Sequence, residues 1–323
     1  MPQIVTITFS PCIDKSTSVF QMVPEKKLKC AYPKLEPGGG GINIGRAIKK
    51  LGGEAITIYP AGGYTGKYFN DLLEKENVPS IIIESQNETR ENIIVRDESS
   101  GRQYRFGMPG NSLSETEIQG ILLALERIND VAYVVVSGSL PPGVPPDIFA
   151  RIAIIAKKKK AKLIVDTSGQ PLKHAIREGL FLVKPNLGEL SFIAGKNYLE
   201  QNDIANAAKQ IIEKNKCEVI VVSMGKEGAL LVTKDLELKF TPPVVKQKST
   251  VGAGDSMVAG IIYSLSNGEE LETAVQYGVA CGTAATLNEG TELCRLEDAE
   301  RLFNIIKKNA GENLLNTYSE SFL

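Results

Sequence analysis

The feature that most constrains the fold is a regular alternation between short β-branched runs and stretches with helical periodicity. Runs typical of strands are Ile4–Phe9, Ala55–Tyr59, Ala132–Val136, Lys162–Val165, Phe181–Val183 and Glu218–Val222. Helical periodicity lies between such runs, for example at Ile42–Leu51, Gly66–Glu76 and Ile118–Ile128. This alternation indicates βαβ units. It predicts an α/β fold in which helices flank a central, mostly parallel sheet.

The alternation is interrupted twice, at about residues 16–35 and 81–106, by short alternating strands. We expect these two segments to form one small β-sheet that stands off the main body as a lid. From Gly254 onward the pattern is mostly helical, at Asp255–Leu265, Leu271–Thr286 and Leu296–Lys308. The predicted organisation is one domain over residues 1–309, followed by a loosely held tail at 310–323 that has no clear period.

Composition excludes several classes of function. Lysine plus arginine number 37 against 38 aspartate plus glutamate, so nothing indicates nucleic acid or an anionic membrane as a partner. The sequence opens on a strand-like run, and no apolar run is long enough to span a membrane. Five cysteines without a C-x-x-C pair favour reduced thiols and a cytoplasmic location. A single histidine excludes histidine metal clusters and a Ser-His-Asp triad.

The strongest candidate for chemistry is the run Gly252-Ala253-Gly254-Asp255, which leads directly into an apolar helical stretch. Unpaired N–H groups at the first turn of a helix form an anion hole, and glycine lets a phosphate approach the backbone. Asp255 could there accept a proton from an attacking hydroxyl. It could equally be only the N-cap of the helix, and these residues alone favour neither interpretation.

A second glycine run, Gly38 to Gly41, precedes another helix and is followed by Asn43. Consecutive glycines lose much backbone entropy on folding, which suggests that a ligand approaches the chain closely there. A sugar laid against Gly39 and Gly40 would meet that need, although a hinge beneath the lid would also explain the glycines. Asp14 follows the first strand, where open parallel sheets bind ligands, and could hold sugar hydroxyls.

Asn186 and Glu189 are three residues apart at the start of a predicted helix, just after Lys184. Their oxygen atoms suit Mg²⁺ held through water, but a helix cap with a first-turn carboxylate is the more ordinary interpretation. The turn from Ser223 to Gly228 has glycines spaced to lie over nucleotide phosphates. Three cations fall in or beside the lid segments and could bind a substrate phosphate: Lys27, Arg90 and Arg105.

Together these motifs resemble the ribokinase-like, PfkB carbohydrate kinase family, over residues 1 to about 308. The resemblance rests on Pro37–Asn43, Lys184–Glu189 and Ser249–Asp255, and also on Tyr104–Gly110 and Ser137–Gly143. Within the family, the sequences of these motifs are most similar to those of members that act on fructose 6-phosphate. Members that act on fructose 1-phosphate usually carry a lysine in the first glycine run, where this chain has only glycine.

The resemblance implies a role for each candidate residue. Asp255 would be the base, and Gly252, Ala253 and Gly254 would form the anion hole. The sugar phosphate would contact Asp14, Gly39, Gly40, Asn43, Arg90, Arg105 and Ser139. ATP would be held by Lys184, Asn186, Ser223, Gly225 and Gly228, with Mg²⁺ near Asn186 and Glu189. A potassium site would lie around Ser249, Val251, Ala285, Asn288 and Gly290.

The resemblance also implies a homodimer in which two lid sheets clasp, with Lys27 reaching the partner's site. One departure from similar sequences is Glu292, which stands where they have arginine, so cation binding or local pairing could differ. The expected reaction is transfer of the γ-phosphate of ATP to the 1-hydroxyl of fructose 6-phosphate, giving fructose 1,6-bisphosphate in glycolysis. Alternatives are tagatose-6-phosphate kinase, 1-phosphofructokinase, or a sugar-phosphate-binding regulator that has lost catalysis.

Overall fold

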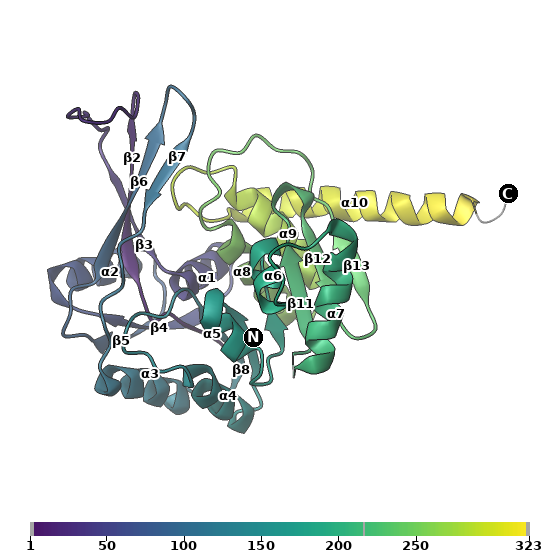
Figure 1. The fold of residues 1–323 in the computed structure, drawn as a ribbon, viewed down its shortest axis with the longest axis horizontal. Coiled ribbons are helices and arrows are strands. Elements are labelled where there is room, and N and C mark those ends of the chain that lie inside the picture. The colour runs from purple at the N-terminus through teal and green to yellow at the C-terminus, as the bar shows by residue number, and fades with distance from the viewer. Residues whose placement is uncertain (1–2, 216, 321–323) are drawn as a thin grey trace.

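The computed structural model describes residues 3–215 and 217–320 and has a nine-stranded main sheet at its centre (Figure 1). The strand order is β13-β12-β11-β10-β9-β8-β1-β4-β5. The bounds are β1 (Gln3–Ile7), β4 (Ala55–Ala61), β5 (Ser80–Glu84), β8 (Val131–Ser137), β9 (Lys162–Asp166), β10 (Leu182–Val183), β11 (Val219–Ser223), β12 (Ala229–Val232) and β13 (Glu237–Phe240). The first seven in chain order pair in parallel, and only β12 and β13 are antiparallel. The predicted α/β class is confirmed.

Helices cover both faces of this sheet, as the alternation predicted. Those described are α1 (Gly40–Lys50), α2 (Gly63–Lys75), α3 (Glu115–Arg127), α4 (Ile148–Lys158), α5 (Gly169–Ala175), α6 (Leu187–Ile193), α7 (Ile204–Lys214), α8 (Ala253–Ser266), α9 (Leu271–Ala285) and α10 (Leu296–Glu320). Helices α1, α8, α9 and α10 pack on one face, and α3 to α7 on the other. Because strand side chains alternate in direction, Ile4 packs in the core on the side of α1, α8, α9 and α10, whereas Val5 packs in the core on the side of α3 to α7.

The order of strands reverses on either side of β1, which pairs with β4 on one side and β8 on the other. After β1 the main sheet continues to β4 and β5 on one side, and the chain then crosses back to β8 and continues to β9 on the other side. A crevice opens at the carboxyl ends of the strands at such a reversal. Asp166 ends β9 and Ser223 ends β11, while Lys184 directly follows β10. The topology alone brings these residues to one edge of the sheet.

A second sheet of four strands stands apart from the main body at upper left in Figure 1. It has the order β3-β2-β6-β7, with bounds β2 (Cys12–Val19), β3 (Lys34–Gly38), β6 (Arg90–Asp97) and β7 (Gln103–Phe106). The predicted lid sheet is thus present, but its limits need correction. Residues 81–84 lie in β5 and pair with β4 in the main sheet. The run Ile81-Ile82-Ile83 is short and β-branched, which suits a strand of either sheet, so the sequence could not assign it.

The segment predicted as a loose tail continues α10, which runs to Glu320 and extends away from the main body in Figure 1. The sequence there lacks a sharp apolar stripe, so periodicity alone could not extend the helix beyond Lys308. Residues 321–323 lie outside the described part. Among the described residues, no helix combines the length and apolar character that a membrane span requires.

Candidate active site

Two adjoining cavities lie along the carboxyl edge of the main sheet. One, of about 440 Å³, is lined by Ser139, Asp166 and Asp255, and the other, of about 560 Å³, by the apolar Pro242–Val245 segment. Asn186, Ser223 and Gly254 line both cavities. They therefore form one cleft with a polar compartment and a more apolar compartment. A phosphorylated acceptor suits the first, and the flat base of a nucleotide suits the second.

Asp255 lies in the first turn of α8, whose N-cap is Gly252 in the left-handed conformation, with φ of 73°. A side chain at Gly252 would be strained there and would meet Leu293, so glycine suits this position. The N–H groups at this helix start have no intrahelical partner and face the cleft where Gly254 and Asp255 line it. These N–H groups are available to an anion, so the anion hole stays a prediction that this geometry allows.

The Asp255 carboxylate accepts a hydrogen bond from Asn43 Nδ2 at 2.8 Å, which leaves its other oxygen free for a ligand. Burial raises the pKa of Asp255 to about 7, helped by the charge of Asp166, while the Asn43 hydrogen bond and Lys184 oppose the rise. A carboxylate with a pKa near neutrality is suited to accept a proton. As it is not the N-cap, the alternative interpretation of Asp255 is wrong.

Lys184 is buried and forms an ion pair with Asp166, with Nζ 3.3 Å from Oδ1. Burial by itself would lower the pKa of Lys184, but the charges of Asp166, Asp255 and Glu189 raise it, so the ammonium stays charged. A side chain added at Gly254 would lie 3.3 Å from Lys184 Nζ. The lysine therefore borders the anion hole, where it can neutralise a phosphate.

Asn186 and Glu189 form a capping box at the start of α6. Asn186 Oδ1 accepts from Glu189 N, and Glu189 Oε2 accepts from Asn186 N, both at 2.9 Å. Burial raises the pKa of Glu189, and the nearby Asp166 raises it further. Asp166 and Glu189 disfavour each other's negative charge, and a divalent cation between them would relieve this repulsion. Glu189 Oε1 makes no capping bond, so it could accept from a water bound to such a cation. The cap and magnesium interpretations are therefore compatible.

Asp14 on β2 is buried, and its Oδ1 accepts hydrogen bonds from Asn92 Nδ2 at 3.0 Å and Cys12 Sγ at 3.4 Å. Burial raises the pKa of Asp14, and these hydrogen bonds counter the rise. Gly38 has no room for a side chain because a Cβ would overlap Asp14 Oδ2. Gly39 has φ of 113°, which L-residues rarely adopt. The second glycine run thus shapes the wall beside Asp14.

The lid cations differ in their placement. Arg105 on β7 donates to Thr250 Oγ1 at 2.7 Å, so the lid touches the loop before the anion hole. Arg90 donates to the carbonyl oxygens of Met108 and Ser10, while its buried Nε has no partner. Lys27 lies in the exposed loop between β2 and β3 and is not brought to the cleft within this chain.

The more apolar cavity is bordered by the turn after β11. Ser223 Oγ donates to Pro185 O at 3.4 Å, and Gly225 and Gly228 have φ of 60° and 89°. A side chain at Gly228 would overlap the carbonyl oxygen of Phe240. These contacts hold the turn against β13 at the mouth of the cavity, where Gly225 and Gly228 line it.

The residues expected to bind potassium also lie together. Ser249 Oγ donates to Gly290 O at 2.9 Å and accepts from Val251 N at 3.2 Å. Asn288 N donates to Ala285 O at 3.2 Å, at the end of α9. Carbonyl and hydroxyl oxygens at the negative end of a helix suit a monovalent cation. Glu292 pairs with Lys34 and Arg295, at 3.5 and 2.7 Å, so its charge is compensated locally.

The sequence interpretation missed two residues that shape this site. Asp166 pairs with Lys184 and raises the pKa of Asp255, and Asn92 holds Asp14. Asp166 directly follows the predicted strand Lys162–Val165, so its position at the carboxyl edge of the sheet was an available signal. Asn92 had no such signal, because the parallel pairing of β2 with β6 joins segments about 80 residues apart.

Comparison with known proteins agrees with this geometry. The family model for pfkB family carbohydrate kinases matches residues 7–299. The chain is 43% identical over 309 residues to ATP-dependent 6-phosphofructokinase isozyme 2 of Escherichia coli, covering 95% of this chain and 100% of the relative. It is 30% identical over 300 residues to 1-phosphofructokinase of Borreliella burgdorferi, covering 93% and 96%.

Among solved structures, the crystal structure of phosphofructokinase-2 from Escherichia coli in complex with potassium matches with a TM-score of 0.91 and 44% identity. The match covers 95% of this chain and 100% of that chain. Both the family model and the relatives span nearly all of the sequence, including the lid segments and the run before α8. The chain belongs to the pfkB family of carbohydrate kinases and is a sugar-phosphate kinase.

Proposed function

We propose that this kinase transfers the γ-phosphate of ATP to the 1-hydroxyl of fructose 6-phosphate. The observation that carries the proposal is the pairing of Asp255 with Asn43 in the polar cavity, beside Gly254, which lines both cavities. This supports Asp255 as a proton acceptor close to both the sugar and the nucleotide. The chain is 43% identical to a 6-phosphofructokinase but only 30% identical to a 1-phosphofructokinase, which supports fructose 6-phosphate over fructose 1-phosphate as the acceptor.

In this proposal Asp255 accepts the proton of the attacking hydroxyl, and the N–H groups at the start of α8 bind the transferred phosphate. Lys184 neutralises charge beside Gly254. Asn43, Asp14 and the glycine run orient the sugar, while Arg90 and Arg105 bind its phosphate together with Ser139. Positioning and charge stabilisation do most of the work in phosphoryl transfer because the transition state is loose.

ATP would lie along the turn containing Ser223, Gly225 and Gly228, with its base against Pro242–Val245. Bound Mg²⁺ would supply charge neutralisation at the phosphates, and Glu189 with Asn186 would hold it through water. The oxygens around Ser249 and Gly290 would take potassium, as suggested by the potassium complex of the Escherichia coli enzyme.

The proposed assembly is a homodimer through the lid sheets. Ile93 and Phe106 pair across β6 and β7, and Tyr104 shares their face. All three are large apolar side chains that are 38–44% exposed, which a partner lid would cover. Lys27 would then reach the partner's cleft.

All five cysteines are free thiols, which supports a reducing, cytoplasmic environment.

An acceptor panel tests the function. ADP release and 31P NMR of the product would be measured with fructose 6-phosphate, tagatose 6-phosphate and fructose 1-phosphate, each with and without potassium. We expect the highest kcat/KM for fructose 6-phosphate and a bisphosphate product. A higher kcat/KM for fructose 1-phosphate or tagatose 6-phosphate would assign the chain to the corresponding kinase instead. No ADP with any acceptor would favour a non-catalytic regulator.

A further inference from the structure

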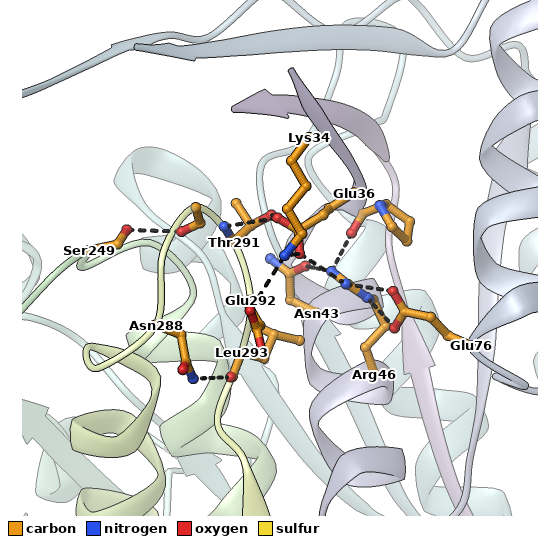
Figure 2. Close-up of polar contacts among 12 residues, drawn as sticks. Lys34, Glu36, Asn43, Arg46, Glu76, Ser249, Asn288, Thr291, Glu292 and Leu293 are labelled. Atoms are coloured by element: carbon orange, nitrogen blue, oxygen red, sulfur yellow. Dashed lines mark hydrogen bonds and ion pairs between the residues drawn. The ribbon is translucent and has the colours of Figure 1, made fainter. Parts of the chain in front are cut away.

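Arg46 on α1 is the largest fully buried side chain of the described residues, at 2% exposed, and it carries a charge. A buried guanidinium destabilises a fold unless its N–H groups are paired. Arg46 Nε and Nη2 donate to the two oxygens of Glu76 at 2.8 and 2.7 Å, and Nη1 donates to Pro37 O at 2.6 Å (Figure 2). The guanidinium is therefore fixed in the plane that these acceptors define.

The same guanidinium faces Asn43, one helical turn earlier. Nη1 donates to Asn43 Oδ1 at 3.5 Å, while Asn43 Nδ2 donates to Asp255 Oδ2 at 2.8 Å. A carboxamide has an acceptor on one side and donors on the other, so a cation on one side decides which way it turns. With Arg46 beside the amide oxygen, the amide N–H groups point at Asp255.

Glu36 on lid strand β3 extends this network. Its Oε1 lies 3.8 Å from Arg46 Nη2 and 3.1 Å from Lys34 Nζ. Its Oε2 accepts from Thr291 N at 3.2 Å and from Thr291 Oγ1 at 3.0 Å. One buried carboxylate thus joins the lid, helix α1 and the loop that carries Gly290 and Glu292, and Figure 2 shows these groups meeting beside Arg46.

We propose that Arg46 is a positioning residue for phosphoryl transfer, which orients Asn43 onto Asp255 while Glu36 and Glu76 hold the guanidinium in place. The inference rests on the proposed function only in taking Asp255 as the base. Arg46 makes no contact with the cleft and acts through Asn43. Through Glu36, the orientation of the base also depends on the seating of β3 and of the Thr291 loop.

The charges that face Asp255 decide the sign of the expected effect. Asp166 and Asp14 raise its pKa, whereas Lys184 and the Asn43 hydrogen bond lower it. A rotated or disordered Asn43 amide would remove one of the two lowering influences. Loss of Arg46 therefore raises the pKa of Asp255, and the acid limb of the kcat profile moves to higher pH.

Arg46→Lys tests the proposal, because lysine keeps a positive charge between the two glutamates but lacks the planar fork. Its matched control is Arg151→Lys on α4, whose ion pair with Glu115 at 2.8 Å is on the surface and away from the cleft. For Arg46→Lys we expect kcat to fall roughly tenfold, with less than a twofold change in the KM for ATP. We expect the acid limb to move up by about one pH unit. The control should match the wild type in all of these.

A substrate-free readout separates this inference from the proposed function. The titration of Asp255 can be followed by carboxyl 13C NMR, with its resonance assigned from the Asp255→Asn spectrum. We expect the pKa of Asp255 to be higher in Arg46→Lys than in the wild type. If the wild type does not phosphorylate fructose 6-phosphate, the assigned acceptor fails while this titration still decides the role of Arg46.

A double-mutant cycle asks whether Arg46 acts through Asn43. In an Asn43→Ala background, Arg46→Lys should neither lower kcat further nor move the pKa of Asp255 further. A further loss there, or an unchanged pKa in a folded Arg46→Lys protein, would overturn the proposal. If Arg46→Lys does not fold, Glu76→Gln replaces one of the two oxygens that accept from the guanidinium by an amide donor, which displaces Arg46. A rise in the pKa of Asp255 is then expected, and an unchanged pKa in folded Glu76→Gln would refute the proposal equally.

Discussion

Replacing Asp255 by asparagine should stabilise the protein while removing its activity. The side chain lies in the first turn of α8, and asparagine can still accept the hydrogen bond from Asn43. What it cannot do is ionise. The cost of holding a charge at this site should therefore vanish together with the ability to take a proton.

The magnitude follows from the pKa of about 7 in the folded protein, against an ordinary aspartate in the unfolded chain. A difference of about 3 pH units corresponds to ~4 kcal/mol in full. Since the carboxylate borders an open cleft, we expect about half of that, ~2 kcal/mol.

The sign depends on pH. Below the unfolded pKa both states are protonated, and Asp255 contributes no difference. Between that value and about 7 the folded state keeps a proton that the unfolded state has lost, so wild-type stability falls as pH rises. The advantage of Asp255→Asn should grow over this range and be complete by pH 8.

Urea unfolding at several pH values from 4 to 8.5 would measure this, with wild type and variant compared at each pH so that other carboxylates cancel. In parallel, kcat from ADP release should fall by about 10²–10⁴ if Asp255 is the base. A free-energy difference that stays constant with pH, or that favours the wild type at pH 8, would refute the pKa argument. Near-normal turnover would refute the assignment of the base.

Three further perturbations have clear expectations. Gly228→Ala should cost about 1–3 kcal/mol of stability in urea unfolding and raise the KM for ATP more than that for the sugar, because the new Cβ meets Phe240 O. Gly268→Ala, with a similar φ of 86° and open space around it, is the control and should leave that KM unchanged. Ser114→Ala removes a capping box on α3 and should cost about 1 kcal/mol without changing kcat, whereas a loss of turnover would contradict a purely structural cap. Tyr104→Lys should convert the proposed dimer to a monomer in sedimentation velocity, and an unchanged sedimentation coefficient would place the interface elsewhere.

The sequence predicted the alternating main sheet, the second sheet and the residues that converge on the cleft, since all of these follow from periodicity and from strand ends. It misplaced the start of the second lid segment, because the β-branched run Ile81-Ile82-Ile83 suits a strand of either sheet and only its pairing with β4 assigns it to the main one. It could not foresee Asn92 beside Asp14 or Glu36 beside Arg46. Both contacts depend on strand pairing and packing between distant segments rather than on any local pattern.

The lid sheet is not a separate insertion, because two of its strands are continuous with elements of the main body. β2 leaves the main sheet just after β1 and carries Asp14, and β3 passes through Gly39 into α1, which carries Asn43. The same two stretches of chain thus supply walls of the proposed sugar site and half of the lid sheet. Substitutions selected for a new acceptor would also shift the proposed subunit contact, so acceptor preference and quaternary structure would be expected to diversify together.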